Sequence, residues 1–163
     1  MKVLIAYRSK HGTTATCARL LGERIHAESV IADLAQTPWP AAREFGVVLL
    51  GGSIYGARIQ REVSAFCNRQ REELLSRKVG VFLCSIYQGE LARAQLQGVF
   101  PEWLLAHAFA TSLFGGELHL SRLTFWDKFS LLGNPRWSQE DLHTDAGAID
   151  ALAAAVNALI PAG

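Results

Sequence analysis

Five short apolar runs of strand length alternate along this chain with longer segments of helical spacing. The apolar runs cover Val3 to Ala6, Val30 to Ala32, Val47 to Leu50, Val79 to Cys84 and Phe109 to Phe114. The helical segments cover Thr14 to His26, Ile59 to Leu75, Glu90 to Ala106 and Ala146 to Ile160. Continuous apolarity is typical of strands that are covered on both faces, and regular alternation with helices favours a parallel sheet. The pattern therefore predicts an α/β fold.

Right-handed crossover connections leave few ways to order five such strands. The simplest is the doubly wound order 2-1-3-4-5, with helices on both faces of a five-stranded parallel sheet and hence three layers. The chain has 163 residues, of which half are hydrophobic, so we expect one domain spanning residues 1–163. Ligands of such sheets bind at the carboxyl ends of the strands. The segments that follow the first, third and fourth strands are therefore the candidate site.

Charge and cysteine content exclude several kinds of partner and site. Sixteen Lys and Arg residues stand against fifteen Asp and Glu residues, a net charge of +1, so no long-range field favours nucleic acid. Cys17, Cys67 and Cys84 lie far apart and include no CxxC pair, which argues against a zinc site or a redox dithiol. We expect three reduced, buried thiols.

The sequence contains no signal for export or for a membrane span. The opening segment, Met1 to Ala6, is too short for a signal peptide and lacks a cleavage site. No window approaches the roughly 18 consecutive apolar residues that a transmembrane helix requires. The expected location is the cytoplasm, with peripheral contact at the inner face of the cell membrane as an open alternative.

The turn after the first strand combines small hydroxyl residues with a glycine just before a helix. It consists of Ser9, Lys10, His11, Gly12, Thr13 and Thr14. Such a turn presents backbone N–H groups at the positive end of a helix, and both favour a bound phosphate. The alternative is an ordinary helix cap formed by Thr13 or Thr14.

Other phosphate-loop and phospho-acceptor folds do not fit this turn. Neither GxGxxG nor GxxxxGK[ST] is present, which weakens dinucleotide and nucleoside-triphosphate sites. A receiver domain shares the strand order but needs acidic residues after the first strand, where this chain has Arg8 and Lys10.

Two further segments at the predicted sheet edge place a tyrosine beside small residues. The candidate residues are Ser53, Ile54, Tyr55 and Gly56 after the third strand and Ser85, Ile86, Tyr87, Gln88 and Gly89 after the fourth. A planar isoalloxazine ring needs flat apolar partners and a close backbone, which Tyr55, Tyr87 and the glycines would supply. The alternative is that each tyrosine only packs over the sheet edge. Three such loops at one edge favour a cofactor with a phosphate and a flavin ring, FMN.

These loops resemble those of the flavodoxin superfamily, whose first loop typically reads Ser/Thr-x-Thr-Gly-x-Thr. Here the loop reads Ser9-Lys10-His11-Gly12-Thr13-Thr14, so His11 replaces a threonine and removes one hydroxyl while leaving the backbone N–H. The resemblance covers nearly the whole chain. It implies a flavodoxin-like fold and bound FMN, whose flavin would carry the redox chemistry.

The second half resembles one branch of that superfamily, the flavodoxin-type protoporphyrinogen dehydrogenases that pass electrons to a quinone. The matching stretches are Gly115-Gly116-Glu117-Leu118 and Phe125-Trp126-Asp127-Lys128-Phe129. The resemblance implies an FMN-dependent oxidoreductase with a small-molecule or quinone electron partner. A net charge of +1 disfavours a dedicated electron carrier, because such carriers are usually strongly acidic. The alternatives are an electron-transfer module without its own organic substrate and an α/β binding protein without flavin.

Two features go beyond a minimal fold of this kind. A helix over Arg122 to Leu132 places Trp126 and Phe129 on one face, which packs on the sheet or, alternatively, lines a cleft or contacts a bilayer. A basic stretch around the third helix is a solvated face or, alternatively, attracts an anionic substrate or lipid. It contains Arg58, Arg61, Arg69, Arg71, Arg77 and Lys78. No Ser/His/Asp or Cys/His arrangement is evident, so no side chain is assigned a role in proton transfer.

Overall fold

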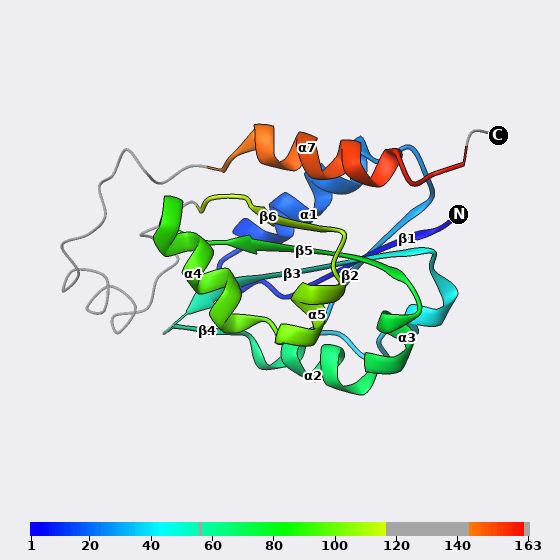
Figure 1. Cartoon of the computed structure of the whole chain (residues 1–163), viewed down its shortest axis with the longest axis horizontal. Helices are drawn as coiled ribbons and strands as arrows, with labels where there is room; N and C mark the ends of the chain where they lie inside the picture. Colours follow the sequence, from blue (N-terminus) through cyan, green and yellow to red (C-terminus); the bar gives the residue numbers. More distant parts are fainter. Residues whose placement is uncertain (56, 117–143, 162–163) are drawn as a thin grey trace.

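A parallel sheet runs through the middle of the structure (Figure 1). The computed structural model describes residues 1–55, 57–116 and 144–161. Its strands are β1 (Val3–Tyr7), β2 (Ser29–Asp33), β3 (Val47–Tyr55), β4 (Arg58–Ile59), β5 (Lys78–Cys84) and β6 (Ala110–Leu113). Their order is β2-β1-β3-β5-β6, with every neighbouring pair parallel, while β4 pairs with β3 alone. The predicted doubly wound order of five parallel strands is confirmed.

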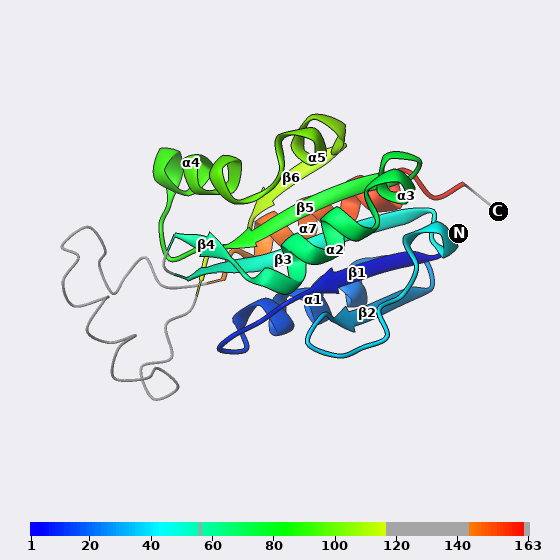
Figure 2. The same cartoon turned by 90° about the horizontal axis from the view of Figure 1, so that it is seen from below.

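Helices cover both faces of this sheet, as the views in Figures 1 and 2 show. One face carries α1 (Thr13–Arg24) and α7 (Ala146–Asn157). The other face carries α2 (Arg61–Arg69), α3 (Arg71–Leu75), α4 (Gly89–Val99), α5 (Glu102–His107) and the short 3₁₀ turn η1 (Ala42–Glu44). The three-layer α/β architecture is therefore as predicted.

Each sheet face has its own core, because successive side chains of a strand point to opposite faces. Leu4 and Ala6 of β1 pack with α2 to α5, whereas Val3 and Ile5 pack with α1 and α7. All four side chains are fully buried. Burial on both faces explains why the strands read as continuous apolar runs rather than as alternating ones.

Two predicted helices are each divided in the structure. The segment from Glu90 to Ala106 breaks at Phe100, which is extended (φ −95°, ψ 147°) because it precedes Pro101. The segment from Ile59 to Leu75 begins as β4 and breaks again at Gln70. The Gln70 side chain accepts a hydrogen bond from Ala42 N and donates one to Pro40 O, so this break fastens the loop before η1 to the helix layer.

The third strand is longer than predicted and ends in a hairpin. It continues past Leu50 to Tyr55 and pairs antiparallel with β4, with Ile54 opposite Ile59 and Tyr55 opposite Arg58. The prediction of a loop directly after Leu50 was therefore wrong. The reason is that β5 continues to pair with β3 as far as Ser53, opposite Cys84, and β4 then takes over the pairing.

The three cysteines, all within the described residues, are buried and form no disulfide, as predicted. Cys67 lies on the inner face of α2, and burial raises the pKa of its thiol to about 12. Cys17 of α1 and Cys84 of β5 lie together on the opposite face of the sheet. A hydrogen bond to Cys17, together with burial, raises the pKa of Cys84 well above its ordinary value.

The pKa of Cys67 predicts a loss of stability at alkaline pH. The unfolded thiol ionises near its ordinary pKa of 9.0, while the folded thiol keeps its proton up to about pH 12. Across that window Cys67 should lower the free energy of unfolding by about 1.4 kcal/mol per pH unit, with its full contribution present below pH 9. The free energy of unfolding of the reduced protein, measured with urea from pH 8 to 11, should therefore decline less steeply in Cys67→Ala than in the unchanged protein. Parallel declines in the two proteins would contradict the assignment.

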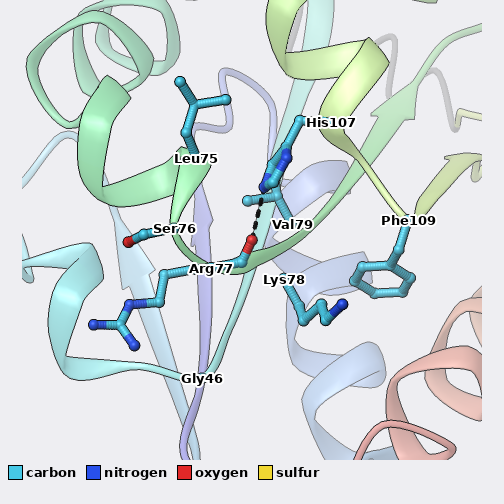
Figure 3. Close-up of a pocket in the computed structure, with 8 residues that line it drawn as sticks. All are labelled: Gly46, Leu75, Ser76, Arg77, Lys78, Val79, His107 and Phe109. Carbon is cyan, nitrogen blue, oxygen red and sulfur yellow. Dashed lines mark hydrogen bonds between the residues drawn. The ribbon is translucent and has the colours of Figure 1, made fainter.

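Two further features of the architecture bear on function. No helix within the described ranges is long and apolar enough to cross a membrane. At the amino edge of the sheet, away from the candidate site, the connections into β3, β5 and β6 surround a cavity of about 340 Å³ (Figure 3). No sequence pattern predicted this cavity.

Candidate functional site

The first predicted loop adopts the conformation that a helix N-terminus needs for anion binding. Gly12 is the N-cap of α1 in the left-handed region (φ 96°, ψ −13°), and its N–H donates to Ser9 Oγ at 2.9 Å. The first helical bond runs from Thr16 N to Gly12 O at 3.0 Å. The N–H groups of the first helical turn have no intrahelical acceptor and point out of the helix end. The loop therefore presents main-chain donors at a positive helix terminus.

The alternative of a threonine cap is wrong. Thr13 and Thr14 lie inside α1, and the N-cap has no side-chain hydrogen bond. The Thr14 side chain is fully buried, and no residue in the described ranges forms a hydrogen bond of standard geometry with its Oγ1. That hydroxyl lies near the Cys84 thiol, whose pKa it lowers against the stronger effects of Cys17 and burial. The Thr14 hydroxyl therefore faces the core beside Cys84 and does not cap the helix.

The other predicted residues of this loop differ in how much they are exposed. The Ser9 hydroxyl accepts a hydrogen bond from Gly12 N, which closes the turn, and its predicted contact with the cofactor stays a prediction. Lys10 is exposed and His11 is half-buried, at the tip of the loop. Lys10 therefore lies at the surface, whereas the Nε2 atom of His11 is buried.

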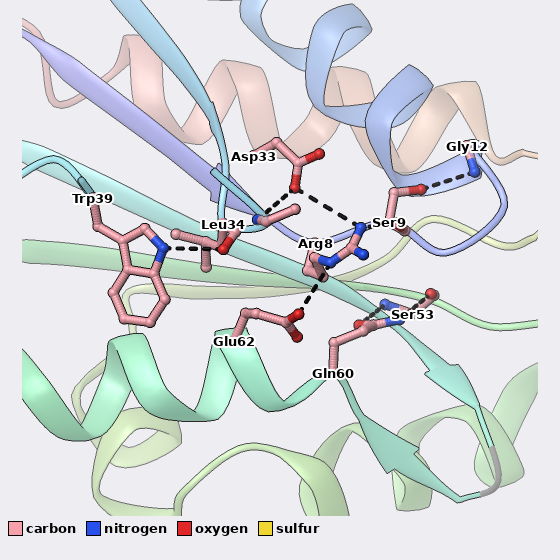
Figure 4. Close-up of polar contacts among 10 residues, drawn as sticks. Arg8, Ser9, Gly12, Asp33, Leu34, Trp39, Ser53, Gln60 and Glu62 are labelled. Atoms are coloured by element: carbon pink, nitrogen blue, oxygen red, sulfur yellow. Dashed lines mark hydrogen bonds and ion pairs between the residues drawn. The ribbon is translucent and has the colours of Figure 1, made fainter. Parts of the chain in front are cut away.

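An ion-pair network beside this loop was not predicted from the sequence (Figure 4). Arg8 lies between Glu62 at the start of α2 and Asp33 at the end of β2, with Nε at 3.4 Å from Glu62 Oε1 and Nη1 at 4.0 Å from Asp33 Oδ1. Arg8 Nη1 also donates to the Ser9 carbonyl. The network ties the loop to two other elements of the carboxyl edge. Only the strand order brings these three charges together, so their spacing in the sequence carries no signal.

The second predicted segment is held by a reciprocal side-chain clasp. Ser53 N donates to Gln60 Oε1 at 3.1 Å, and Gln60 Nε2 donates to Ser53 Oγ at 2.7 Å (Figure 4). Ser53 and Ile54 lie in β3, so they form a rigid edge rather than the predicted loop. The backbone of Tyr55 ends β3, and the adjacent Gly56 lies outside the described residues. Their predicted contacts with a ring stay predictions.

Loss of the Gln60 clasp should loosen this hairpin without unfolding the protein. Gln60→Ala removes two hydrogen bonds at a half-buried position, and we expect the free energy of unfolding to fall by about 1–2 kcal/mol. Gln97→Ala is the matched control, because Gln97 is exposed on α4. Chemical denaturation of both variants measures the difference. Equal stability of the two variants would show that the clasp contributes nothing.

The third predicted segment follows β5, and hydrogen bonds of the Ser85 hydroxyl hold its turn in place. Ser85 is almost fully buried, with its Oγ donating to Gln95 Oε1 at 2.7 Å and accepting from Tyr87 N at 3.1 Å. These bonds of the hydroxyl shape the turn, and the predicted cofactor contact of Ser85 stays a prediction. Ile86 and Tyr87 are half-buried, whereas Gln88 and Gly89 are exposed. Gly89 opens α4 with a φ of 59°, and a side chain added there would meet open space.

These segments are joined into one continuous edge. Arg8 N donates to Gly51 O at 3.2 Å, which links the first loop to β3. Ser85 N donates to Gly115 O at 3.0 Å, which links the third segment to the end of β6. A Cβ on Gly116 would lie 3.1 Å from the carbonyl of Ser85, so the backbones are in close contact there. Gly115 and Gly116 stood out in the sequence only for their resemblance to a family branch, and their bracing role was not predicted.

The three predicted segments lie along one edge of the sheet, and their contacts with an anion and a flat ring stay predictions. The anion would meet the N–H groups at the start of α1, and the ring would lie between the segments that follow β3 and β5. Within residues 1–55, 57–116 and 144–161, no group of three His, Cys, Asp or Glu side chains could hold a metal ion. Burial raises the pKa of the Cys67 thiol, and a hydrogen bond to Cys17 together with burial raises that of Cys84, so neither thiol is activated as a nucleophile.

Two comparisons with known proteins, one with family models and one with solved structures, agree on the fold. A family model described as the Flavodoxin domain matches residues 4–143. A search of curated protein sequences gives no match. Three of the solved structures that share the fold are described below, and their identities to this chain lie below 25%, which shows the fold alone.

The flavodoxin of Streptococcus pneumoniae TIGR4 has 12% identity and a TM-score of 0.57, over 98% of this chain and 100% of that one. A flavodoxin, WrbA-like protein from Agrobacterium tumefaciens has 13% identity and a TM-score of 0.58, over 97% and 96%. A flavoprotein in complex with FMN from Lactobacillus acidophilus NCFM has 15% identity and a TM-score of 0.52, over 69% and 92%.

Proposed function

The chain belongs to the Flavodoxin domain family, and we propose on this premise that it binds one FMN at the carboxyl edge of its sheet and transfers electrons through it. The observation that carries the proposal is the left-handed Gly12 at the N-terminus of α1. That conformation places the turn directly before α1, where the N–H groups of the first helical turn and the positive helix end favour an anion. The flavoprotein from Lactobacillus acidophilus, which shares the fold, is described in complex with FMN.

Different parts of the edge would hold the two ends of the cofactor. Residues Ser9 to Thr14 would bind the phosphate through backbone N–H groups at the start of α1. The segments around Ile54 and Ile86 to Gln88 would contact the ring, supported by the Gln60 clasp and by Ser85. When bound, FMN supplies the electron-transfer chemistry, and the chain supplies position and access.

Within this function we propose an oxidoreductase with a small-molecule partner rather than a dedicated protein-to-protein carrier. A carrier that docks on basic partners uses unpaired negative charge near its cofactor. At this edge Asp33 and Glu62 are shared with Arg8, and Glu90 is paired with Arg93 at 3.0 Å. The whole chain has a net charge of +1. An electron-transfer module without an organic substrate is the second candidate, because proteins described as flavodoxins have the same fold.

The finer proposal is a quinone-linked relative of the flavodoxin-type protoporphyrinogen dehydrogenases. It depends on the sequence resemblance at Gly115-Gly116 and on Phe125 to Phe129, of which the second stretch lies outside the described residues. The helix predicted over Arg122 to Leu132, with Trp126 and Phe129, lies there as well. Peripheral contact with a membrane, where quinones reside, is part of this proposal.

Anaerobic reduction of the FMN-loaded protein separates the two candidates. The reduced protein is mixed with a soluble quinone, menadione, or with a basic one-electron acceptor protein, cytochrome c, and reoxidation is followed at about 450 nm, the usual flavin band. The proposed oxidoreductase should reoxidise with the quinone much faster than with the protein acceptor. The opposite preference would favour the carrier. Protoporphyrinogen added to the oxidised protein then tests the finer proposal, which fails if the flavin is not reduced.

A further inference from the structure

The turn before α1 is held in place by the side chain of the residue that precedes it, Arg8. The backbone N–H of Arg8 donates to Gly51 O of β3 at 3.2 Å, which fixes its main chain to the sheet. Its side chain donates through Nη1 to the carbonyl of Ser9. Ser9 in turn accepts a hydrogen bond from Gly12 N through Oγ, at 2.9 Å (Figure 4). The conformation of the turn therefore depends on where the Arg8 side chain lies.

Carboxylates from two other elements hold the Arg8 side chain. Glu62 Oε1, at the start of α2, accepts a hydrogen bond from Arg8 Nε at 3.4 Å. Asp33 Oδ1, at the end of β2, lies 4.0 Å from Arg8 Nη1 (Figure 4). All three side chains are partly buried, so solvent screens their attraction less than it screens that of fully exposed pairs. The guanidinium group is therefore fixed between α2 and β2.

This cluster does not attract a phosphate by its charge. One guanidinium group faces two carboxylates, which leaves a formal excess of one negative charge. Two of the three guanidinium nitrogen atoms, Nε and Nη1, already donate to acceptors of the protein. A contribution of Arg8 to phosphate binding would therefore come from the position that it gives to the turn.

A lysine cannot take over this arrangement. Nε and Nη1 belong to one rigid plane, and together they reach the Glu62 carboxylate and the Ser9 carbonyl. The ammonium group of a lysine is a single point charge on a flexible chain, so it keeps the charge but not this pair of contacts. Arg8→Lys therefore separates the position of the turn from its charge.

We propose that Arg8 is a positioning residue for the cofactor phosphate. It holds the Ser9 carbonyl against Glu62 and Asp33, and it thereby keeps the N–H groups at the start of α1 in place for an anion. Donors that are fixed before binding lose less conformational entropy when the ligand arrives. The inference rests on the proposed FMN function and deepens it, because it names the side chain on which the preference for a phosphorylated flavin depends.

The affinities of Arg8→Lys for FMN and for riboflavin test the proposal. The two ligands share the ring, so the ratio of their affinities isolates the phosphate. We expect Arg8→Lys to bind FMN about tenfold less tightly, the loss expected for one hydrogen bond of a charged group, and to bind riboflavin as the unchanged protein does. A general loss of stability would instead weaken the binding of both ligands.

Two further variants separate positioning from charge. Arg43→Lys is the matched control, because Arg43 is exposed before β3 and pairs with Glu73 at 3.3 Å. It should change neither affinity. Glu62→Ala removes a negative charge but also an anchor of Arg8, and we expect it to weaken FMN binding relative to riboflavin binding. A direct contact between Arg8 and the phosphate would predict the opposite, tighter FMN binding, because the cation would lose a competing carboxylate.

Hydrogen exchange of the Gly12 N–H in the ligand-free protein is a second readout, which needs no flavin. This N–H donates to Ser9 Oγ, so loosening of the turn should speed its exchange. NMR should show faster exchange in Arg8→Lys and Glu62→Ala than in the unchanged protein and Arg43→Lys. Circular dichroism of each variant confirms that the fold is retained.

Three results would overturn the proposal. They are equal FMN-to-riboflavin ratios in Arg8→Lys and Arg43→Lys, unchanged or tighter FMN binding by Glu62→Ala, and unchanged exchange of the Gly12 N–H in Arg8→Lys. If the unchanged protein did not bind FMN, the proposed function would fail instead. The exchange measurement would still decide whether Arg8 positions the turn.

Discussion

Gly12→Val is expected to lower the affinity for FMN by about 100-fold or more while the sheet and its helices still form. Gly12 has a φ of 96°, a conformation that glycine adopts freely and that costs a non-glycine residue about 1–3 kcal/mol, with β-branched residues at the upper end. Valine would push the loop out of this region and shift the N–H groups at the start of α1. Its branched side chain would also occupy the space where a phosphate approaches the backbone. Titration of the apoprotein with FMN, followed by flavin fluorescence, gives the affinity.

Gly98→Val is the matched control for this substitution. Gly98 lies in α4 and is exposed, and a side chain added there would meet open space, so valine should leave FMN affinity unchanged. Its effect on stability should be neutral to slightly favourable, because valine is a better helix residue than glycine. If Gly12→Val bound FMN as tightly as Gly98→Val does, the loop would be a plain helix start and not a phosphate site.

Phe82→Ala should lower the free energy of unfolding by about 3–5 kcal/mol, the largest stability loss we expect from one substitution. Phe82 is fully buried in β5 and stacks on Phe114, with ring centroids 4.8 Å apart and an interplanar angle of 23°. Its ring also covers Gly51 of the neighbouring strand, where an added Cβ would overlap it. Alanine would leave a cavity between the sheet and the layer formed by α1 and α7. Urea denaturation measures the loss.

A double-mutant cycle with Gly51→Ala tests the cause of this loss. In the natural background Gly51→Ala should cost about 1–3 kcal/mol, because its methyl group would displace the Phe82 ring. In the Phe82→Ala background the same change should be close to neutral, since the ring is gone. The two substitutions are then strongly non-additive, as expected for residues in contact. Additive losses would show that Gly51 is small for a reason other than the Phe82 ring.

The strand order was predictable because it follows from local composition. Continuous apolar runs specify buried parallel strands, and handedness then leaves one simple order. Even the break before Pro101 carried a local signal, which the helical spacing of Glu90 to Ala106 outweighed in the prediction. The extension of β3 to Tyr55 carried none, since the pairing with β4 depends on a hairpin that only the fold creates.

The three predicted loops lie at one edge of the sheet as expected, while their contacts with a ligand stay predictions. They lie along the carboxyl edge because the ends of parallel strands meet there. The hydroxyls of Ser53 and Ser85, however, are used in bonds to Gln60 and Gln95, which lie seven and ten residues further along the chain. Arg8 gains its two carboxylate partners only through the order of the strands. Such roles depend on tertiary contacts and leave no trace in spacing.

The central claim is that main-chain donors at the start of α1 bind the phosphate of FMN, and the affinities for FMN and for riboflavin test it most directly. The two ligands share the same ring and differ in the phosphate. Several charge-assisted hydrogen bonds at a helix terminus predict that FMN binds about 100-fold or more tightly than riboflavin. Equal affinity for the two ligands would contradict the claim, because the phosphate would then contribute nothing to binding.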